Sequence, residues 1–159
     1  MSGDFVVQSF GPKDIDQVVR INWTCLPENY DNTFFLDLYY HFPKSFIVAK
    51  VGDMVIGYIM CRVETGFSEK KRFSLTRKGH IVSVAVLPEH RRQGIASALL
   101  EKTLEALKEY RASEVFLEVR VSNKAAIGLY EKFGFSTSRE ITGYYRDGET
   151  ARVMVKTIA

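Results

Sequence analysis

The segment EHRRQGIASALLEK, residues 89–102, combines residue types that bind phosphate with the start of a helix. Arg91 and Arg92 precede Gly94, and an amphipathic helical pattern begins directly after this glycine. A helix N-terminus carries unpaired backbone N–H groups and a partial positive charge, and both attract anions. Glycine lets the backbone approach a ligand closely, and the arginines add positive charge. The segment therefore predicts a pyrophosphate-binding turn between a strand and a helix.

Two familiar phosphate motifs do not fit this turn. A P-loop would end in Gly-Lys-Ser or Gly-Lys-Thr, and a dinucleotide-binding fingerprint would carry three spaced glycines. Neither pattern is present. A strand–helix turn without any ligand remains the alternative interpretation of the segment alone.

The composition excludes several classes of protein. The 159 residues are about one domain long, with 46% apolar and 26% charged residues. The net charge of +3 is too small to indicate nucleic-acid binding by itself. The N-terminal sequence lacks a signal-peptide pattern, and no apolar run is long enough to span a membrane. Cys25 and Cys61 lack metal-ligand spacing, so we expect two reduced core cysteines in a cytoplasmic protein.

Hydrophobic periodicity predicts one α+β domain over residues 1–159. Helical patterns alternate with strand patterns, and a Gly52-Asp53 hairpin turn and a second turn at Asp147-Gly148 are expected. The strand–helix–strand order across residues 80–121 implies one parallel strand pair, and the other connections imply antiparallel pairs. Helices are expected at 12–26, 32–42, 96–111 and 124–134, and strands at 5–10, 45–51, 54–63, 80–86, 114–121 and at two positions near the C-terminus.

Residues 66–79, GFSEKKRFSLTRKG, carry five basic residues and one acidic residue. A solvated loop between strands is the favoured interpretation, and a binding surface is the alternative.

At this point a family resemblance becomes specific. RRQGIA at 91–96 matches the R/Q-x-x-G-x-G/A acetyl-CoA signature of the GNAT acetyltransferases. LPENY, RKGHIVSVAVLPEHRRQGIA, LEVRVSNKAAIGLYEKFGF and GYYRDGETA resemble, more narrowly, N-terminal protein acetyltransferases related to RimI, in the archaeal form of the NatA catalytic subunit. The resemblance extends from Phe5 to the C-terminus, and four ordered blocks are far more specific than one short signature.

The resemblance implies a GNAT fold with a largely antiparallel twisted sheet flanked by helices. The strand 80–86 would splay from the strand 114–121 and leave a cleft for acetyl-CoA, the expected cosubstrate. The exposed backbone of Val84, Ala85 and Val86 would pair with the pantetheine arm, as an added strand would. Asn123 and Tyr130 would flank the thioester, although Asn123 is also a plausible N-cap. The pyrophosphate turn would comprise Arg91, Arg92, Gln93, Gly94, Ile95, Ala96 and Ser97.

The same resemblance supplies roles in catalysis. Glu28, within LPENY, would accept the proton of the amine through a water molecule. His80 would be the alternative base or would hold that water, unless it is only a structural cap. Tyr130 would protonate the leaving thiolate or would simply pack, and the backbone N–H of Val86 or a neighbour would polarise the thioester carbonyl.

Three tyrosines and one possible ligand pair complete the expected site. Tyr30, Tyr144 and Tyr145 would line the place where the peptide enters. His80 and Glu118 lie on expected neighbouring strands, but two ligands are too few to predict a metal.

Physical chemistry favours an α-amine as the acceptor. The pKa of an α-amine is about 7.7–8.0 against about 10.4 for lysine, so roughly one α-amine in ten is already neutral at pH 7. We therefore expect acetylation of protein or nascent-peptide N-termini. The resemblance implies Ser, Ala, Thr or Gly as the first residue, with Met also tolerated.

Other functions stay open. A RimI-like enzyme for one ribosomal protein and a small-amine or lysine acetyltransferase are the enzymatic alternatives. An acyl-CoA-binding regulator without turnover is the alternative from another class. The 66–79 segment is a further candidate, as an RNA surface for transient docking at the ribosome. Neither a membrane nor a specific nucleic-acid sequence is expected as a partner.

Overall fold

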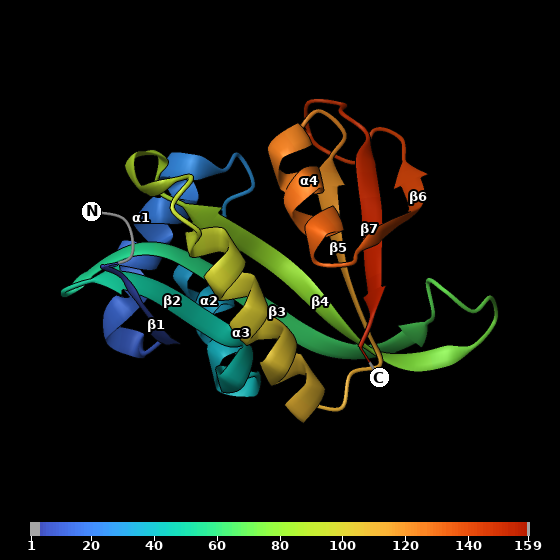
Figure 1. Ribbon diagram of the computed structural model, residues 1–159, viewed down its shortest axis with the longest axis horizontal. Coiled ribbons are helices and arrows are strands. Elements are labelled where there is room, and N and C mark those ends of the chain that lie inside the picture. Colours follow the sequence, from blue (N-terminus) through green and yellow to red (C-terminus); the bar gives the residue numbers. More distant parts are fainter. Residues whose placement is uncertain (1–3, 159) are drawn as a thin grey trace. The chain divides into compact units, whose positions relative to one another are not determined.

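The computed structural model describes residues 4–158. Residues 1–3 and 159, which the predicted domain and the N-terminal sequence include, lie outside the described part. Seven strands form one sheet in the order β1-β2-β3-β4-β5-β7-β6 (Figure 1). The strands are β1 (Val6–Ser9), β2 (Phe46–Val51), β3 (Met54–Phe67), β4 (Leu75–Val86), β5 (Glu114–Arg120), β6 (Ser136–Ile141) and β7 (Ala151–Thr157). The α-helices are α1 (Ile15–Cys25), α2 (Asn32–His41), α3 (Ile95–Glu109) and α4 (Lys124–Lys132).

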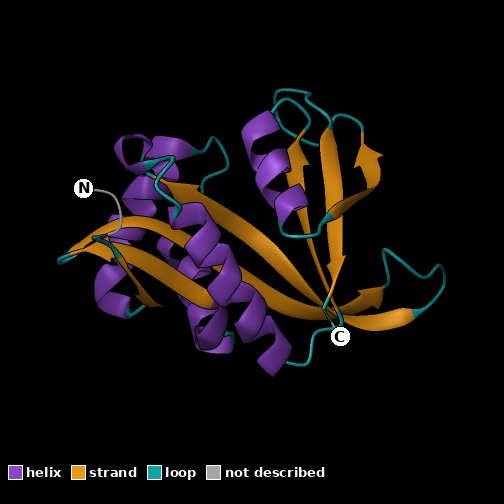
Figure 2. Ribbon diagram, viewed as in Figure 1, coloured by secondary structure: helices purple, strands orange, loops and turns teal. Residues whose placement is uncertain are grey.

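The chain divides into two compact units. The first comprises the residues up to Arg62 together with Ile81–Glu109. Here β1 pairs with β2 and β2 with β3, both antiparallel, and Gly52 makes the β2–β3 turn at φ +59°. Helices α1 and α2 cover one face of these strands, and α3 covers the other (Figure 2).

Aromatic side chains fill the core of the first unit. The rings of Phe10 and Phe46 stack with centroids 4.0 Å apart. The ring centroid of Phe35 lies 6.4 Å from that of Phe46 and 6.2 Å from that of Tyr58. All four side chains are buried. On the other face, α3 buries Leu99, Leu100 and Leu107, whereas Leu104, which shares the apolar pattern of the helix, is half-buried.

The second unit comprises Val63–His80 and the residues from Tyr110 onward. Its strand β5 pairs antiparallel with β7, and β7 pairs antiparallel with β6. The predicted parallel pair is confirmed, because Lys78, Gly79 and His80 of β4 pair with Glu114, Val115 and Phe116 of β5. The splayed opening beyond these residues remains a prediction. Together with the strand order, these pairings confirm the α+β fold with a mixed, largely antiparallel sheet.

The prediction of a loop over residues 66–79 was wrong at both ends. Strand β3 continues to Phe67 and β4 starts at Leu75, so the loop spans only 68–74. Lys78 is buried, and its Nζ donates to Phe67 O at 2.8 Å and to Glu69 Oε2 at 3.1 Å. Composition could not reveal this, because a lysine that closes a buried ion pair looks the same in the sequence as one in solvent.

Glu69 is the centre of that buried ion pair. Ser138 Oγ and Arg139 Nε donate to Glu69 Oε1 at 2.8 and 3.0 Å, while Lys78 occupies Oε2. Burial by itself would raise the pKa of Glu69, but the hydrogen bonds from Arg139, Ser138 and Lys78 together lower it to about 2. The carboxylate therefore fixes the base of the β3–β4 hairpin as an anion.

Glu69→Gln should lower the free energy of unfolding by about 3 kcal/mol at pH 7, because it leaves the buried Lys78 without its paired carboxylate. The stabilisation is complete above the ordinary pKa of 4.5 and is lost as the pH falls toward 2, so the two proteins should converge over that interval. Urea unfolding from pH 2.5 to 7 measures both effects. Glu109→Gln, which breaks the exposed Lys44–Glu109 pair, is the control and should cost less than about 0.5 kcal/mol. Equal losses in the two variants would contradict the argument.

Among residues 4–158, no helix is both long and apolar enough to cross a membrane.

Candidate active site

The turn before α3 has an unusual backbone. Arg92 and Gly94 adopt positive φ angles of 62° and 81°, and α3 begins at Ile95. The first intrahelical bond runs from Ala98 N to Gly94 O, which leaves the preceding N–H groups at the exposed start of a 15-residue helix. A Cβ at Gly94 would meet no atom within 4 Å. Glycine therefore suits position 94 because the backbone there is left-handed, and not because a side chain would collide with the rest of the protein.

The turn is anchored to the first unit by backbone and side-chain bonds. Leu87 N donates to Ile56 O at 2.9 Å, and Arg91 Nε donates to Val86 O at 2.9 Å. The same carbonyl accepts from Cys25 Sγ at 3.6 Å. Part of the Arg91 guanidinium is thus committed to the turn itself. Arg91 and Arg92 are both exposed, and their contribution of charge to pyrophosphate binding remains a prediction.

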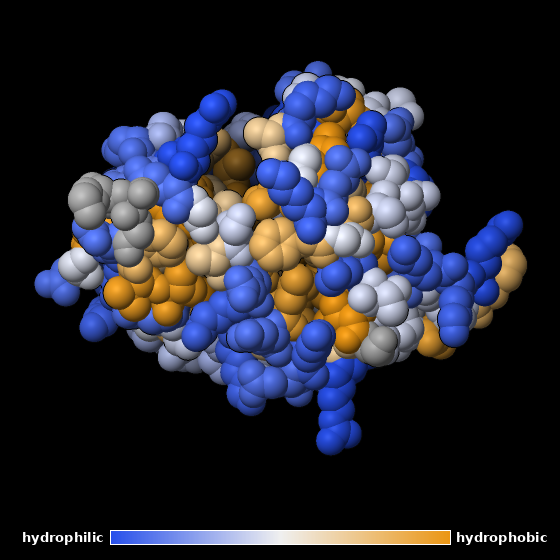
Figure 3. Space-filling model, in the orientation of Figure 1, coloured by the Kyte–Doolittle hydropathy of each residue, from blue (hydrophilic) through white to orange (hydrophobic). Residues whose placement is uncertain are grey.

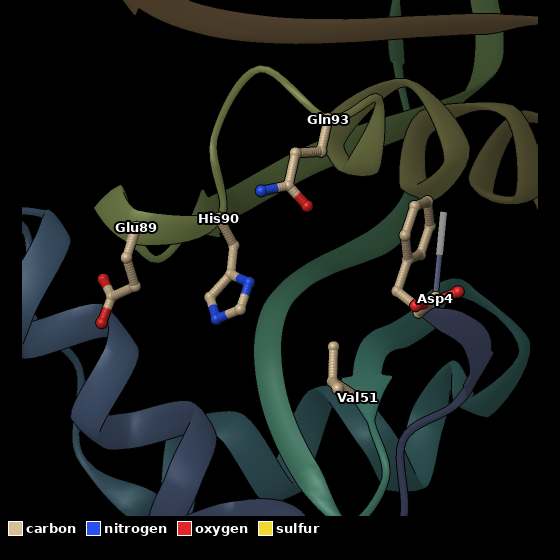
Figure 4. Close-up of a pocket in the computed structure, with 6 residues that line it drawn as sticks. Asp4, Val51, Glu89, His90 and Gln93 are labelled. Atoms are coloured by element: carbon tan, nitrogen blue, oxygen red, sulfur yellow. The ribbon is translucent and has the colours of Figure 1, made fainter. Parts of the chain in front are cut away.

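Gln93 lies at a pocket of about 230 Å³ beside the turn. His90 and Gln93 face this space from the turn, and Asp4 and Val51 line it from the N-terminal segment and the end of β2 (Figure 4). The role of Gln93 in pyrophosphate binding remains a prediction.

Glu28 lies half-buried in the loop between α1 and α2, as LPENY predicts. Its backbone is held by Asn22, whose Nδ2 donates to Glu28 O at 3.1 Å. The Oδ1 of Asn22 accepts from Asn29 Nδ2 at 3.2 Å and from Tyr30 N at 3.4 Å. Sequence analysis missed Asn22, because a polar residue inside a helix gives no sign that it is buried and bound to the following loop. The ring of Tyr30 also stacks on Phe34 at 4.5 Å.

Two buried hydroxyl groups connect Asn22, which holds this loop, to the sheet. Asn22 Nδ2 also donates to Tyr58 OH at 3.1 Å, and Tyr58 OH lies 2.7 Å from Ser83 Oγ on β4. Burial raises the pKa of Tyr58 to about 12, so the phenol stays neutral and keeps its proton for bonding. The Glu28 loop is therefore connected by hydrogen bonds to the strand that carries Val84, Ala85 and Val86.

In the second unit His80 pairs with Glu118. Nε2 lies 2.7 Å from Glu118 Oε1, and the imidazole stacks on Phe116 with centroids 4.4 Å apart. A carboxylate can only accept, so Nε2 carries the proton and Nδ1 of the neutral ring carries the lone pair. Nδ1 is buried and has no hydrogen-bond partner among the described residues. The carboxylate of Glu118 thus fixes the orientation of the imidazole.

Asn123 and Tyr130 lie at the two ends of α4. Asn123 is the N-cap, because its Oδ1 accepts from Ala126 N at 3.2 Å, and its side chain remains exposed. Tyr130 is buried with its ring 5.8 Å from that of Phe135. Tyr144 and Tyr145 lie in the loop between β6 and β7, with ring centroids 5.0 Å apart.

The predicted site residues therefore form two groups. The first unit holds Glu28, Tyr30, Val84 to Val86 and the turn from Arg91 to Ser97. The second unit holds His80, Asn123, Tyr130, Tyr144 and Tyr145. Within residues 4–158, no three His, Cys, Asp or Glu side chains are grouped as metal ligands. The first unit thus presents a helix start that suits an anion, and the second unit presents a histidine oriented by a carboxylate.

Comparisons with known proteins agree with this chemistry. Residues 15–135 match the acetyltransferase (GNAT) family. An N-alpha-acetyltransferase of Saccharolobus solfataricus is 48% identical over 157 residues, which cover 98% of this chain and 94% of that protein. The structure of Ard1 from Thermoplasma volcanium superposes with a TM-score of 0.84 at 34% identity, covering 98% of this chain and 99% of the other. Arabidopsis thaliana Naa50, solved with the bisubstrate analogue CoA-Ac-MVNAL, has a TM-score of 0.82 at 26% identity, covering 97% and 99%.

The chain belongs to the GNAT acetyltransferase family, as the signature at residues 91–96 predicts. Acetyl-CoA is the acetyl donor of this family, so the predicted cosubstrate is confirmed. The relatives also confirm the assignment to the N-alpha-acetyltransferase branch.

Proposed function

We propose that this enzyme transfers an acetyl group from acetyl-CoA to the α-amino group of protein N-termini beginning with Ser, Ala, Thr or Gly, and that it tolerates Met. The observation that carries the proposal is the left-handed turn at Arg92 and Gly94 before α3, in a chain 48% identical to an N-alpha-acetyltransferase over most of its length. The residue roles follow from the contacts of each unit.

Backbone groups would hold acetyl-CoA. The N–H groups from Gly94 to Ser97 point out of the start of α3 and suit the pyrophosphate, with the guanidinium of Arg92 beside them. The backbone of Val84, Ala85 and Val86 would pair with the pantetheine arm by strand addition. Asn123 would contact the thioester end while its Oδ1 continues to cap α4.

Two side chains are candidates for the proton acceptor, Glu28 first and His80 second. Glu28 would act through a water molecule, since Asn22 holds its backbone in a fixed loop. The Nδ1 of His80, oriented by Glu118, is the second acceptor. An α-amine needs only modest help, because its pKa lies about 2.5 units below that of lysine.

The thiolate of CoA would receive its proton from Tyr130. Tyr130→Phe keeps the buried ring and removes the phenolic proton. We expect kcat to fall about tenfold with little change in KM for acetyl-CoA, because a thiolate leaves readily and needs less acid assistance than most groups. Steady-state kinetics on a Ser-initiated peptide provides the measurement, and Tyr40→Phe, at an exposed position of α2, is the control. An unchanged kcat, or a loss confined to KM, would reduce Tyr130 to a packing residue.

The experiment that tests the function itself is a peptide panel. Peptides with free and with blocked α-amines are incubated with acetyl-CoA, and released thiol is measured. Acetylation of diverse free N-termini supports the proposal. Activity confined to one ribosomal-protein N-terminus would favour a RimI-like enzyme, activity on blocked peptides would favour lysine or small amines, and absence of thiol release would favour a non-catalytic acyl-CoA-binding protein.

We further propose that the 68–74 loop makes transient contact with ribosomal RNA. Lys70, Lys71 and Arg72 are consecutive, and Phe73 beside them is 83% exposed. Figure 3 shows hydrophilic and apolar side chains together at this end of the β3–β4 hairpin. Basic side chains suit phosphates, and an exposed aromatic ring suits an unpaired base.

Charge removal from this loop tests the RNA contact. The variant with Lys70, Lys71 and Arg72 all changed to Gln should bind purified ribosomes more weakly and reduce the log–log salt slope by about 2. Lys13, Lys102 and Lys108 changed together to Gln form the matched control. Equal losses in both triple variants would mean that only overall charge matters. The free cysteines Cys25 and Cys61 suit the cytoplasm, which we propose as the location.

A further inference from the structure

The loop at residues 142–150, between β6 and β7, has a defined internal structure. Tyr145 N donates to Glu149 O at 3.2 Å, and Gly148 N donates to Tyr145 O at 2.8 Å. Gly143 and Gly148 adopt positive φ angles of 66° and 91° and allow the chain to turn. The result is a compact loop that presents Tyr144, which is 47% exposed, beside the half-buried Tyr145.

One arginine of the neighbouring strand contacts three residues of this loop. Arg120, the last residue of β5, donates from Nη1 to Asp147 Oδ2 at 2.8 Å and to Glu149 Oε1 at 2.9 Å. Its guanidinium carbon lies 4.1 Å from the centroid of the Tyr145 ring. Lysine could not reproduce this arrangement, because only a planar guanidinium combines several directed donors with a face that stacks on a ring.

Both carboxylates have second partners that fix their orientation. Asp147 Oδ1 accepts from Glu149 N at 3.0 Å, and Glu149 Oε2 accepts from Ser122 N at 3.0 Å. Hydrogen bonding from the Glu149 backbone, and then from Arg120, lowers the pKa of Asp147. Bonds from Ser122 and then from Arg120 lower the pKa of Glu149. Both groups therefore stay ionised at neutral pH, and the cluster connects the loop to β5 and to the residue before the α4 N-cap.

We propose that Arg120 is a positioning residue that holds the 142–150 loop in the conformation in which Tyr144 and Tyr145 receive the substrate peptide. This role rests on the proposed function for the two tyrosines. Arg120 itself touches neither the acetyl donor nor the amine in this role. It acts through Asp147, Glu149 and the ring of Tyr145, and loss of these contacts releases the loop.

The test uses Arg120→Met, which removes the guanidinium, and Asp147→Asn, which changes only the exposed end of the cluster. Amide hydrogen exchange in residues 142–150 should become about three- to tenfold faster in each. The KM for a Ser-initiated peptide should rise by a similar factor, while kcat and the KM for acetyl-CoA stay within about twofold. Arg120→Lys should recover only part of the loss. Arg152→Met is the matched control, since Arg152 lies on β7 and its Nη2 pairs with Glu140 Oε2 at 3.6 Å.

Each readout can overturn a separate part of the inference. Unchanged exchange in Arg120→Met and Asp147→Asn would show that the loop does not depend on Arg120, whatever the enzyme acetylates. Faster exchange with an unchanged peptide KM would show that the loop does not position the peptide. A loss in Arg152→Met equal to that in Arg120→Met would assign the effect to general sheet stability. If no N-terminal peptide is acetylated by the unmodified enzyme, the proposed function fails, and the exchange data still decide the structural role of Arg120.

Discussion

Gly94→Glu should weaken acetyl-CoA binding by at least about a hundredfold while the protein stays folded. The added carboxylate would stand at the start of α3, where its charge opposes a pyrophosphate and its bulk blocks a close backbone approach. A Cβ at this position meets nothing within 4 Å, so the folded chain has room for the side chain. The remaining cost is the left-handed backbone at φ +81°, which amounts to about 1–2 kcal/mol.

Gly52→Glu separates the two effects. Gly52 also has a positive φ, +59°, and its Cβ would also meet nothing within 4 Å, but it lies in the β2–β3 turn. We expect the same loss of stability in both variants by thermal unfolding, and loss of acetyl-CoA affinity by calorimetry only for Gly94→Glu. Near-native affinity in a folded Gly94→Glu protein would overturn the assignment of the turn as the pyrophosphate site.

Local signals account for what the sequence predicted correctly. Proline and aspartate just before α1, the Gly52-Asp53 turn and Gly134 after α4 set backbone angles by short-range chemistry, and the sequence patterns place these elements correctly to within a few residues. The signature at residues 91–96 could predict the family for the same reason, because its residues all lie within one turn of the chain. The α1 boundary differs slightly, since Pro12 to Asp14 form a 3₁₀ turn before the helix begins at Ile15.

Long-range polar contacts account for what the sequence could not predict. From the sequence, Lys78 belongs to a basic loop. Its ion pair with Glu69, nine positions earlier, is visible only in the structure. Asn22 and Tyr58 are 36 positions apart, and Arg120 and Asp147 are 27 apart, so neither pairing leaves a local pattern. Similarly, the sequence placed His80 and Glu118 on neighbouring strands but could not show that they are in direct contact at 2.7 Å. The residues that position the site are therefore harder to predict than the residues that form it.

Glu28→Gln should reduce kcat/KM on a Ser-initiated peptide by about a hundredfold at pH 7. Glutamine preserves size and hydrogen bonding but cannot accept a proton, and a positioned base contributes about 10²–10⁴-fold. The low end applies because roughly one α-amine in ten is already neutral at pH 7. The hydrogen bond from Asn22 Nδ2 to Glu28 O involves the backbone of Glu28 and not its side chain, so the loop should keep its place in the variant.

The dependence on pH decides what Glu28 does. If Glu28 removes the proton of the amine, the defect should shrink as the pH rises above the α-amine pKa of about 7.7–8.0, where deprotonation no longer needs help. Measurement of kcat/KM from pH 6 to 10 on Glu28→Gln, His80→Gln and the control Glu105→Gln on α3 tests this. A smaller loss in His80→Gln is expected if histidine only holds the water, whereas a larger one would make Nδ1 of His80, oriented by Glu118, the principal base. A Glu28→Gln defect that stays constant over the whole range would mean that Glu28 positions the peptide and that the proton leaves by another route.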